Sequence, residues 1–183
     1  MFKTVNFLGT VDQWAEMNIS DPSANPIWIS KALYINGEIL RKCTITVPYI
    51  KPYTFFECDS IRELTLAEGV RRVGASAFQG CNSHTGYNGD YTYYFTELTL
   101  PESIETIDYA AFKYCANINT LYIPKNINVI GTSAFEGCIR MSKIMYNGTK
   151  EEWKNITLKD LWSSRVKTTQ ITCTDGFLNL ENN

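Results

Sequence analysis

Histidine is almost absent from this sequence, because His84 is the only one. The six cysteines never occur as Cys-x-x-Cys. Zinc sites usually draw on closely spaced cysteine and histidine ligands, so the usual donor set is missing. Gly-rich phosphate-binding loops and nucleophile motifs are missing as well. We therefore expect no metal, no cofactor and no enzymatic activity.

The sequence also has little net charge and no long hydrophobic run. Its formal charge of −2 gives no electrostatic reason to expect nucleic acid or an anionic membrane as a partner. No apolar run approaches the roughly 18–20 residues of a membrane span. The first ten residues contain one basic side chain, Lys3, and do not resemble a secretory signal peptide. We expect the chain inside the cell that makes it, or at the cell surface if it is a piece of a longer exported protein.

What the sequence does contain is one motif in four copies. Three copies read Ala-Phe-x-x-Cys, and the first has Thr54 in place of the alanine. The phenylalanines are separated by 23, 34 and 23 residues, and 34 is 23 plus an insertion of 11. A fixed period near 23 predicts a solenoid, in which each unit buries its apolar face against its neighbours. The repeated phenylalanines are Phe55, Phe78, Phe112 and Phe135.

Other apolar positions recur in the same phase. One set opens short alternating segments that predict strands, at Leu64, Leu98, Leu121 and Ile144. A second set lies five residues before each repeated phenylalanine, at Ile50, Val73, Ile107 and Ile130. We predict an α/β repeat solenoid of about 23 residues per repeat, in which short strands alternate with a short helical turn that carries the phenylalanine and the cysteine.

The four motif cysteines share one repeat phase, so the solenoid places them in a column. Free cysteine is among the most buried residue types, and we expect these thiols to be buried and reduced. Two alternatives remain: a disulfide between rungs, which lie only about 4.8 Å apart, or metal binding. The cysteines concerned are Cys58, Cys81, Cys115 and Cys138.

We expect one domain over residues 1–183. Residues 1–43 form an N-terminal cap in this interpretation, residues 44–146 form the repeat array, with the insertion at 82–94, and residues 147–183 form a C-terminal cap. Both predicted caps contain the pattern Gly-Thr-x-x-x-Trp, which suits a threonine N-cap on a short helix.

The same two segments contain carboxylates that resemble acid–base groups, namely Asp12, Glu151 and Glu152. A position in the first turn of a helix explains them more simply, because negative charge is stabilising there. We do not assign catalysis to them.

Several segments resemble the BspA-like, or Treponema-type, leucine-rich repeats. They are Leu121-Tyr122-Ile123-Pro124, the stretch from Ile130 to Cys138, and Tyr146-Asn147-Gly148-Thr149-Lys150-Glu151-Glu152-Trp153. The resemblance extends from Phe7 to about Gly176 and implies a leucine-rich-repeat-like stack. It also implies a non-enzymatic, protein-binding role, as in bacterial surface proteins proposed as adhesins for host matrix proteins. It supplies no catalytic or ligand residue to transfer.

The insertion at 82–94 is the first candidate binding site. Insertions in repeat proteins map to loops on one face, often the binding face. Tyrosine, serine, glycine and asparagine are typical of recognition loops. The alternative is a hairpin packed on the flank of the solenoid, turning at Asn88-Gly89. Ser83, His84 and Asp90 resemble a triad in composition, but nothing orients them as one. The candidate contact residues are Tyr87, Tyr91, Tyr93 and Tyr94.

The second candidate is the outward face of the predicted sheet, because extended solenoid sheets are common binding surfaces. Its residues are Thr65, Thr99, Tyr122 and Met145. We expect the partner to be another protein. The alternative function is a self-contained intracellular protein, or a protein of a phage or mobile element, that binds and inhibits another protein.

Overall fold

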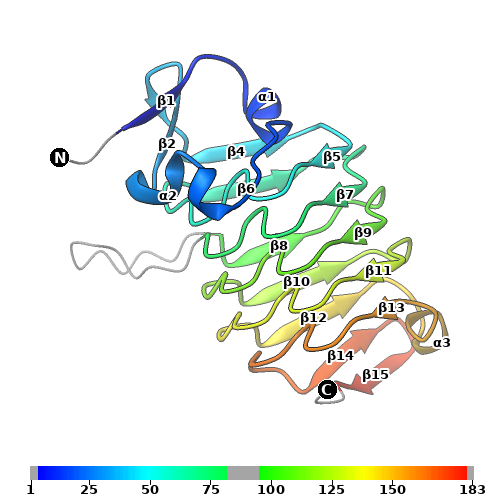
Figure 1. Ribbon diagram of the computed structural model, residues 1–183. Helices are drawn as coiled ribbons and strands as arrows, with labels where there is room; N and C mark the ends of the chain where they lie inside the picture. The colour runs from blue at the N-terminus through cyan, green and yellow to red at the C-terminus, as the bar shows by residue number, and fades with distance from the viewer. Residues whose placement is uncertain (1–3, 82–94, 181–183) are drawn as a thin grey trace.

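The computed structural model describes residues 4–81 and 95–180, which form a solenoid of about five coils with about 23 residues in each. Successive coils lie directly on one another along one axis (Figure 1). Each coil contributes a strand to a long sheet, a shorter strand to a second sheet, and a series of turns on the third side. The predicted repeat solenoid is therefore confirmed.

The long side of each coil is a parallel strand. On this side, β4 and β6 of the first two coils pair with each other. The strands of the later coils continue the same side as a separate sheet, in the order β8, β10, β12, β14. The predicted column of Leu98, Leu121 and Ile144 is in direct register, and Ile171 extends it. An antiparallel strand, β15, closes this sheet. The bounds are β4 (Lys42–Ile45), β6 (Glu63–Leu66), β8 (Glu97–Thr99), β10 (Thr120–Ile123), β12 (Lys143–Tyr146), β14 (Gln170–Cys173) and β15 (Gly176–Asn179).

The second side is a parallel sheet of two-residue strands. Its inward residues include the predicted column of Ile50, Val73, Ile107 and Ile130, which are fully buried. The strands are β5 (Tyr49–Ile50), β7 (Arg72–Val73), β9 (Thr106–Ile107), β11 (Val129–Ile130) and β13 (Thr157–Leu158).

The third side carries the Phe-x-x-Cys motifs, and here the prediction of a helical turn is wrong. The motif consists of successive turns, because the residues two before and two after each phenylalanine have positive φ. In the second coil these are Ser76, at φ 52°, and Gly80, at φ 73°. The left-handed residues turn alternate N–H groups toward the next coil, so Ser76, Phe78 and Gly80 donate hydrogen bonds of 2.8–2.9 Å to carbonyls there. A helix would direct these donors along its own axis instead.

The four repeated phenylalanines stack in the interior. Phe112 lies between Phe78 and Phe135, at ring-centroid distances of 5.2 and 5.4 Å and interplanar angles of 2° and 5°. Phe55 continues the stack beyond Phe78, at 5.1 Å. All four rings have no exposed surface. The predicted phenylalanine column is therefore confirmed as the centre of the core.

The cysteine column is buried, as predicted, and its four thiols are free. The thiols of Cys81, Cys115 and Cys138 donate to the carbonyl of the phenylalanine in the preceding coil, at 2.8, 3.1 and 3.3 Å. Cys58 belongs to the first coil and contacts the Ser60 hydroxyl at 3.3 Å instead. Burial raises the pKa of Cys58 to about 11 and that of Cys138 to about 12. These thiols stay protonated at neutral pH and act as structural hydrogen-bond donors.

The two Gly-Thr-x-x-x-Trp segments form the predicted short helices, α1 and α3. Thr10 and Thr149 both make a capping box, with Gln13 and Glu152 respectively. Trp14 and Trp153 are buried, as expected. The N-terminal part also contains a small three-stranded sheet and two further short helices (Figure 1). The bounds are β1 (Val5–Phe7), α1 (Val11–Ala15), η1 (Pro22–Ala24), α2 (Ile27–Ser30), β2 (Leu33–Ile35), β3 (Glu38–Ile39) and α3 (Lys150–Trp153). None of the helices in the described part of the chain has the length and apolar character needed to cross a bilayer.

Candidate functional site

The outward face of the long sheet carries a row of side chains that runs along the solenoid axis. Strand pairing aligns Thr99 with Tyr122, Tyr122 with Met145, and Met145 with Thr172. The β14–β15 hairpin adds Phe177 opposite Thr172. Because side chains alternate between the two faces of a strand, these residues point outward while their neighbours fill the core. Tyr122 is 37% exposed and Phe177 is 65% exposed.

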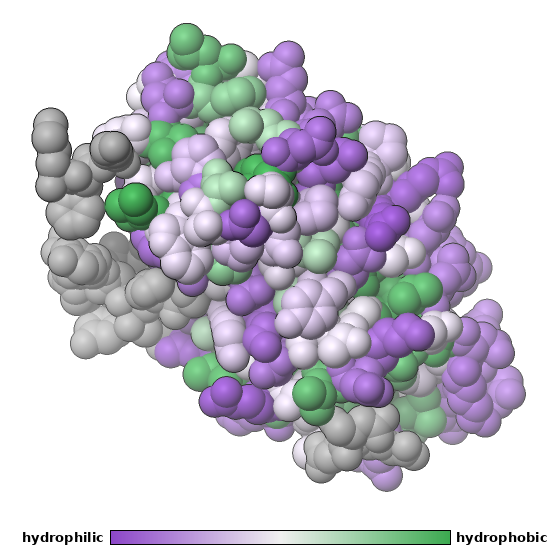
Figure 2. Space-filling model, in the orientation of Figure 1, coloured by the Kyte–Doolittle hydropathy of each residue, from purple (hydrophilic) through white to green (hydrophobic). Residues whose placement is uncertain are grey.

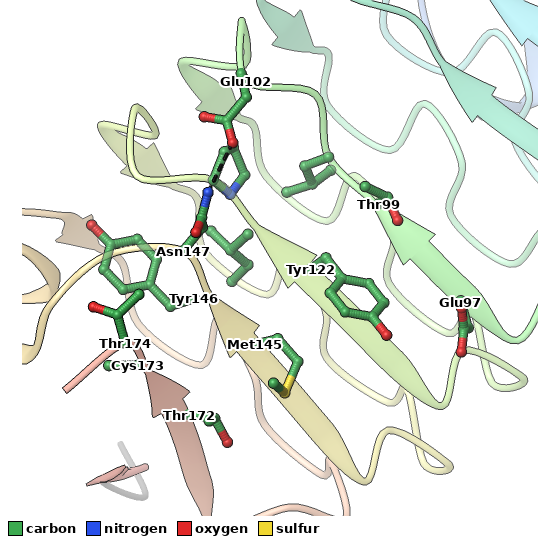
Figure 3. Close-up of a pocket in the computed structure, with 13 residues that line it drawn as sticks. Glu97, Thr99, Glu102, Tyr122, Met145, Tyr146, Asn147, Thr172, Cys173 and Thr174 are labelled. Atoms are coloured by element: carbon green, nitrogen blue, oxygen red, sulfur yellow. Dashed lines mark hydrogen bonds between the residues drawn. The ribbon is translucent and has the colours of Figure 1, made fainter. Parts of the chain in front are cut away.

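A groove of about 600 Å³ follows this row over β8, β10, β12 and β14 (Figure 3). Figure 3 shows Thr99, Tyr122, Met145 and Thr172 on successive strands along its floor. The residues that line it are Glu97, Thr99, Leu100, Glu102, Tyr122, Ile123, Pro124, Met145, Tyr146, Asn147, Thr172, Cys173 and Thr174.

Hydrogen bonds between coils hold one rim of the groove. The Asn147 side-chain amide donates to the Glu102 carboxylate at 3.0 Å, across two coils. Asn126 donates to the Glu102 backbone carbonyl, also at 3.0 Å. The Glu68 carboxylate accepts the backbone N–H groups of Glu102 and Ser103 at 2.9 and 3.2 Å. The rim is therefore tied to neighbouring coils and pre-organised around the floor.

The surface in Figure 2 is mostly hydrophilic over the coil stack, with hydrophobic residues interspersed. Ion pairs also link successive coils. Arg71 pairs with Glu105 at 2.7 Å, and Arg72 pairs with Asp108 at 2.8 Å. These pairs occupy a side of the solenoid different from the groove, since they lie on and beside β7 and β9.

The structure brings together part of the site that the sequence predicted. Thr99, Tyr122 and Met145 lie together in the groove. Thr65 is exposed on β6 opposite Thr44, but it does not line the groove. Four predicted contact residues lie outside the described residues: Tyr87, Tyr91, Tyr93 and Tyr94.

Sequence reasoning missed several groove residues. Thr172 lines the groove on β14, and Phe177 lies opposite it on β15 without lining the groove; both lie beyond the last copy of the repeat motif. The alternation in Gln170–Cys173, followed by Asp175-Gly176, is a hairpin signal that could have identified them. Glu97 is the first residue of β8 and Glu102 lies in the turn that follows this strand. The repeat pattern does not distinguish them from other surface carboxylates.

The carboxylates near the capped helices have structural roles. Asp12 accepts hydrogen bonds from both the backbone and the hydroxyl of Thr46, with an N···O distance of 2.9 Å for the first. Hydrogen bonds from Thr149 lower the pKa of Glu152 within its capping box. Glu151 pairs with Lys154 at 2.6 Å. The described residues contain no group of three or more His, Cys, Asp or Glu side chains that could hold a metal ion.

Comparison with protein-family models identifies the family of this chain. No curated protein and no solved structure matches it significantly. A family model for the BspA type leucine rich repeat region matches residues 28–155 and 87–176, with six copies of the repeat. These ranges together span most of the 183 residues and contain all four motif copies. The chain therefore belongs to the BspA-type leucine-rich repeat family.

Proposed function

We propose that this protein is a non-enzymatic module that binds another protein through the outward face of its long sheet. The observation that carries the proposal is the groove on that face, where Tyr122 and Met145 lie beside polar residues on a rigid sheet. Partly exposed aromatic side chains on pre-organised elements are typical anchors of protein interfaces. Family membership supports the same class of function.

The resemblance to bacterial surface adhesins makes host matrix proteins the first partners to test. Collagen, fibronectin, laminin and fibrinogen would be immobilised and their binding to the purified protein measured. The double variant Tyr122→Ser/Met145→Ser removes the centre of the groove. Truncation of a central aromatic typically costs about 2 kcal/mol or more, which is roughly thirtyfold in affinity. We expect the double variant to lose binding by at least that factor and to retain its melting temperature.

Two controls separate this site from others. Tyr109→Ser removes a tyrosine that is 54% exposed just after β9, on a different side, and should leave binding unchanged. The triple variant Tyr87→Ser/Tyr91→Ser/Tyr93→Ser tests the insertion predicted from sequence. Loss of binding only in the triple variant would move the site from the sheet to the insertion. If no matrix protein binds, proteins of the producing cell become the next panel, as the alternative of an intracellular inhibitor requires.

A further inference from the structure

The groove has a one-sided charge. The two charged side chains that line it, Glu97 and Glu102, are both carboxylates. Glu102 already accepts the hydrogen bond from Asn147. Within the described residues, the Glu97 side chain has neither a hydrogen bond nor an ion pair, and it is exposed. A binding surface that presents unpaired negative charge favours a cationic occupant.

Two cations that share a strand row or a hollow with Glu97 lie outside the groove. Glu97, Thr120 and Lys143 are aligned on three successive strands. Thr120 therefore separates Lys143 from Glu97 by two strand spacings, about 9.6 Å. Arg140 lies in an adjoining hollow of about 310 Å³, which Glu97 also lines, and is not within ion-pair distance of Glu97. Neither side chain lines the groove itself.

Tyr122 supplies the second feature. A cation within about 6 Å of an aromatic centroid is attracted by the negative face of the ring. This protein uses that contact elsewhere, since Lys113 lies 5.0 Å from the centroid of Tyr114 and Arg72 lies 5.0 Å from that of Tyr49. No cation of the described residues lies over Tyr122, although its ring is partly exposed in the groove.

The positions of these groups are compatible with one occupant. Glu97 pairs with Thr120, two residues before Tyr122, so Glu97 and Tyr122 are diagonal neighbours on the same face. Diagonal neighbours on adjacent strands lie about 7–8 Å apart, within reach of one long side chain. Met145 follows Tyr122 on the next strand and offers a flexible apolar contact to an aliphatic stem.

We propose that the groove binds a basic side chain, arginine or lysine, of the partner protein. The cation lies between the Glu97 carboxylate and the Tyr122 ring, and its methylene stem packs on Met145. This inference rests on the proposed function of the sheet face and specifies the partner chemistry at that face. It predicts that the partner offers an exposed basic segment and that binding weakens as salt is added.

The test uses two short peptides that differ in one charge. The probes are Ac-Gly-Leu-Arg-Leu-Gly-NH2 and the same peptide with norleucine in place of arginine, so the stem is kept and the cation removed. The readout is the 13C-methyl resonance of Met145 in protein with labelled methionine methyl groups. The methyl of Met141, which is fully buried, serves as an internal reference.

We expect the arginine peptide to shift Met145 and leave Met141 unchanged, and the norleucine peptide to bind at least about tenfold more weakly. The norleucine peptide lacks the hydrogen bonds to the charged carboxylate, and a tenfold loss corresponds to about 1.4 kcal/mol. Glu97→Gln should weaken the arginine peptide by a similar factor. Glu63→Gln is the matched control, because Glu63 is a carboxylate on the same outward face that pairs with Lys42 and lies outside the groove.

Equal binding of the two peptides would overturn the cationic occupant while leaving the sheet face as the binding surface. Unchanged affinity in Glu97→Gln would also overturn it. If neither peptide shifts the Met145 resonance, the inference is rejected as well. The proposed function fails by a different result, namely unchanged capture of a whole partner by the Tyr122→Ser/Met145→Ser variant.

Discussion

The indole Nε1 of Trp14 donates a hydrogen bond of 2.7 Å to the backbone carbonyl of Thr54, a contact that lies in the buried interior. In the later coils the equivalent carbonyls, those of Ala77, Ala111 and Ala134, accept the backbone N–H of the phenylalanine in the preceding coil. The first coil has no such neighbour, so a tryptophan side chain from α1 takes the place of the missing N–H. The Asn25 side-chain amide adds a hydrogen bond of 2.6 Å to the Tyr53 carbonyl and a longer contact of 3.4 Å to the same Thr54 carbonyl.

Trp14→Phe should therefore destabilise the protein by about 1–3 kcal/mol, because it removes the 2.7 Å hydrogen bond to the buried Thr54 carbonyl and leaves only the 3.4 Å contact from the Asn25 side-chain amide. Urea unfolding measures the change. The matched control is Trp28→Phe, since Trp28 is 41% exposed and stacks on Phe56 through its ring, an interaction that phenylalanine can keep. Equal losses in both variants would show that ring size, and not the indole N–H, stabilises this end.

Phe112→Ala should cost about 3–5 kcal/mol, the usual range for a buried phenylalanine. The substitution interrupts the ring stack in the middle of the array, between Phe78 and Phe135. Thermal and urea unfolding provide the measurement. Phe177→Ala is the control, because its side chain is largely exposed and the change should stay within about 0.5 kcal/mol. An unchanged melting temperature for Phe112→Ala would contradict the role of the stack.

All six cysteines should titrate as free thiols in denaturant without reductant, since all six are free and buried. In the native protein the reagent that titrates the thiols should react slowly with them. The thiolate is the nucleophile, and burial raises the pKa of these thiols, as for Cys81 and Cys115. Fewer than six thiols in denaturant would reveal a disulfide, and rapid reaction of the native protein would place a thiol at the surface.

Stability should fall as the pH rises above about 8.5, the usual pKa of a cysteine in an unfolded chain. Above that pH the unfolded thiols release protons, while Cys138 stays protonated up to about pH 12. The unfolded state then binds fewer protons, so the free energy of unfolding decreases by about 1.4 kcal/mol per pH unit for each such thiol.

The measurement compares wild type with Cys138→Ala by urea unfolding between pH 8 and about pH 11, a window that follows from these pKa values. The variant loses the thiol hydrogen bond to Phe112 at every pH, but its stability should decline less steeply with rising pH. Parallel pH curves for the two proteins would show that Cys138 does not contribute to the pH dependence.

Tyr146→Phe should leave the protein as stable or stabilise it by up to about 1 kcal/mol. The buried Tyr146 hydroxyl has no hydrogen-bond partner among the residues that the structure describes, and an unsatisfied buried polar group is costly. Burial also raises the pKa of this tyrosine. Urea unfolding of the variant is the test, with Tyr109→Phe as an exposed control. A loss of more than 1 kcal/mol would indicate that the hydroxyl makes a favourable interaction.

The groove could be predicted in part. Alternation along each strand identified Thr99, Tyr122 and Met145 as outward residues, because a strand exposes every second side chain. Thr172 and Phe177 belong to strands without the repeat motif, so their position in the same row depends on how the last hairpin pairs. The Asn147–Glu102 contact joins residues 45 positions apart and has no signal in the local sequence.

The sequence alone determined the repeat length, the core columns of phenylalanine and cysteine, and the two capped helices. These features follow from spacing and from local hydrogen bonding, which need no knowledge of distant contacts. Only the tertiary structure decided that the Phe-x-x-Cys segments are turns with left-handed residues. Ser76, Ala110 and Ser133 adopt positive φ because their N–H groups gain carbonyl acceptors in the next coil. The stacked coils thus override the local preference for a helical turn, and the same stacking leaves the Thr54 carbonyl to Trp14.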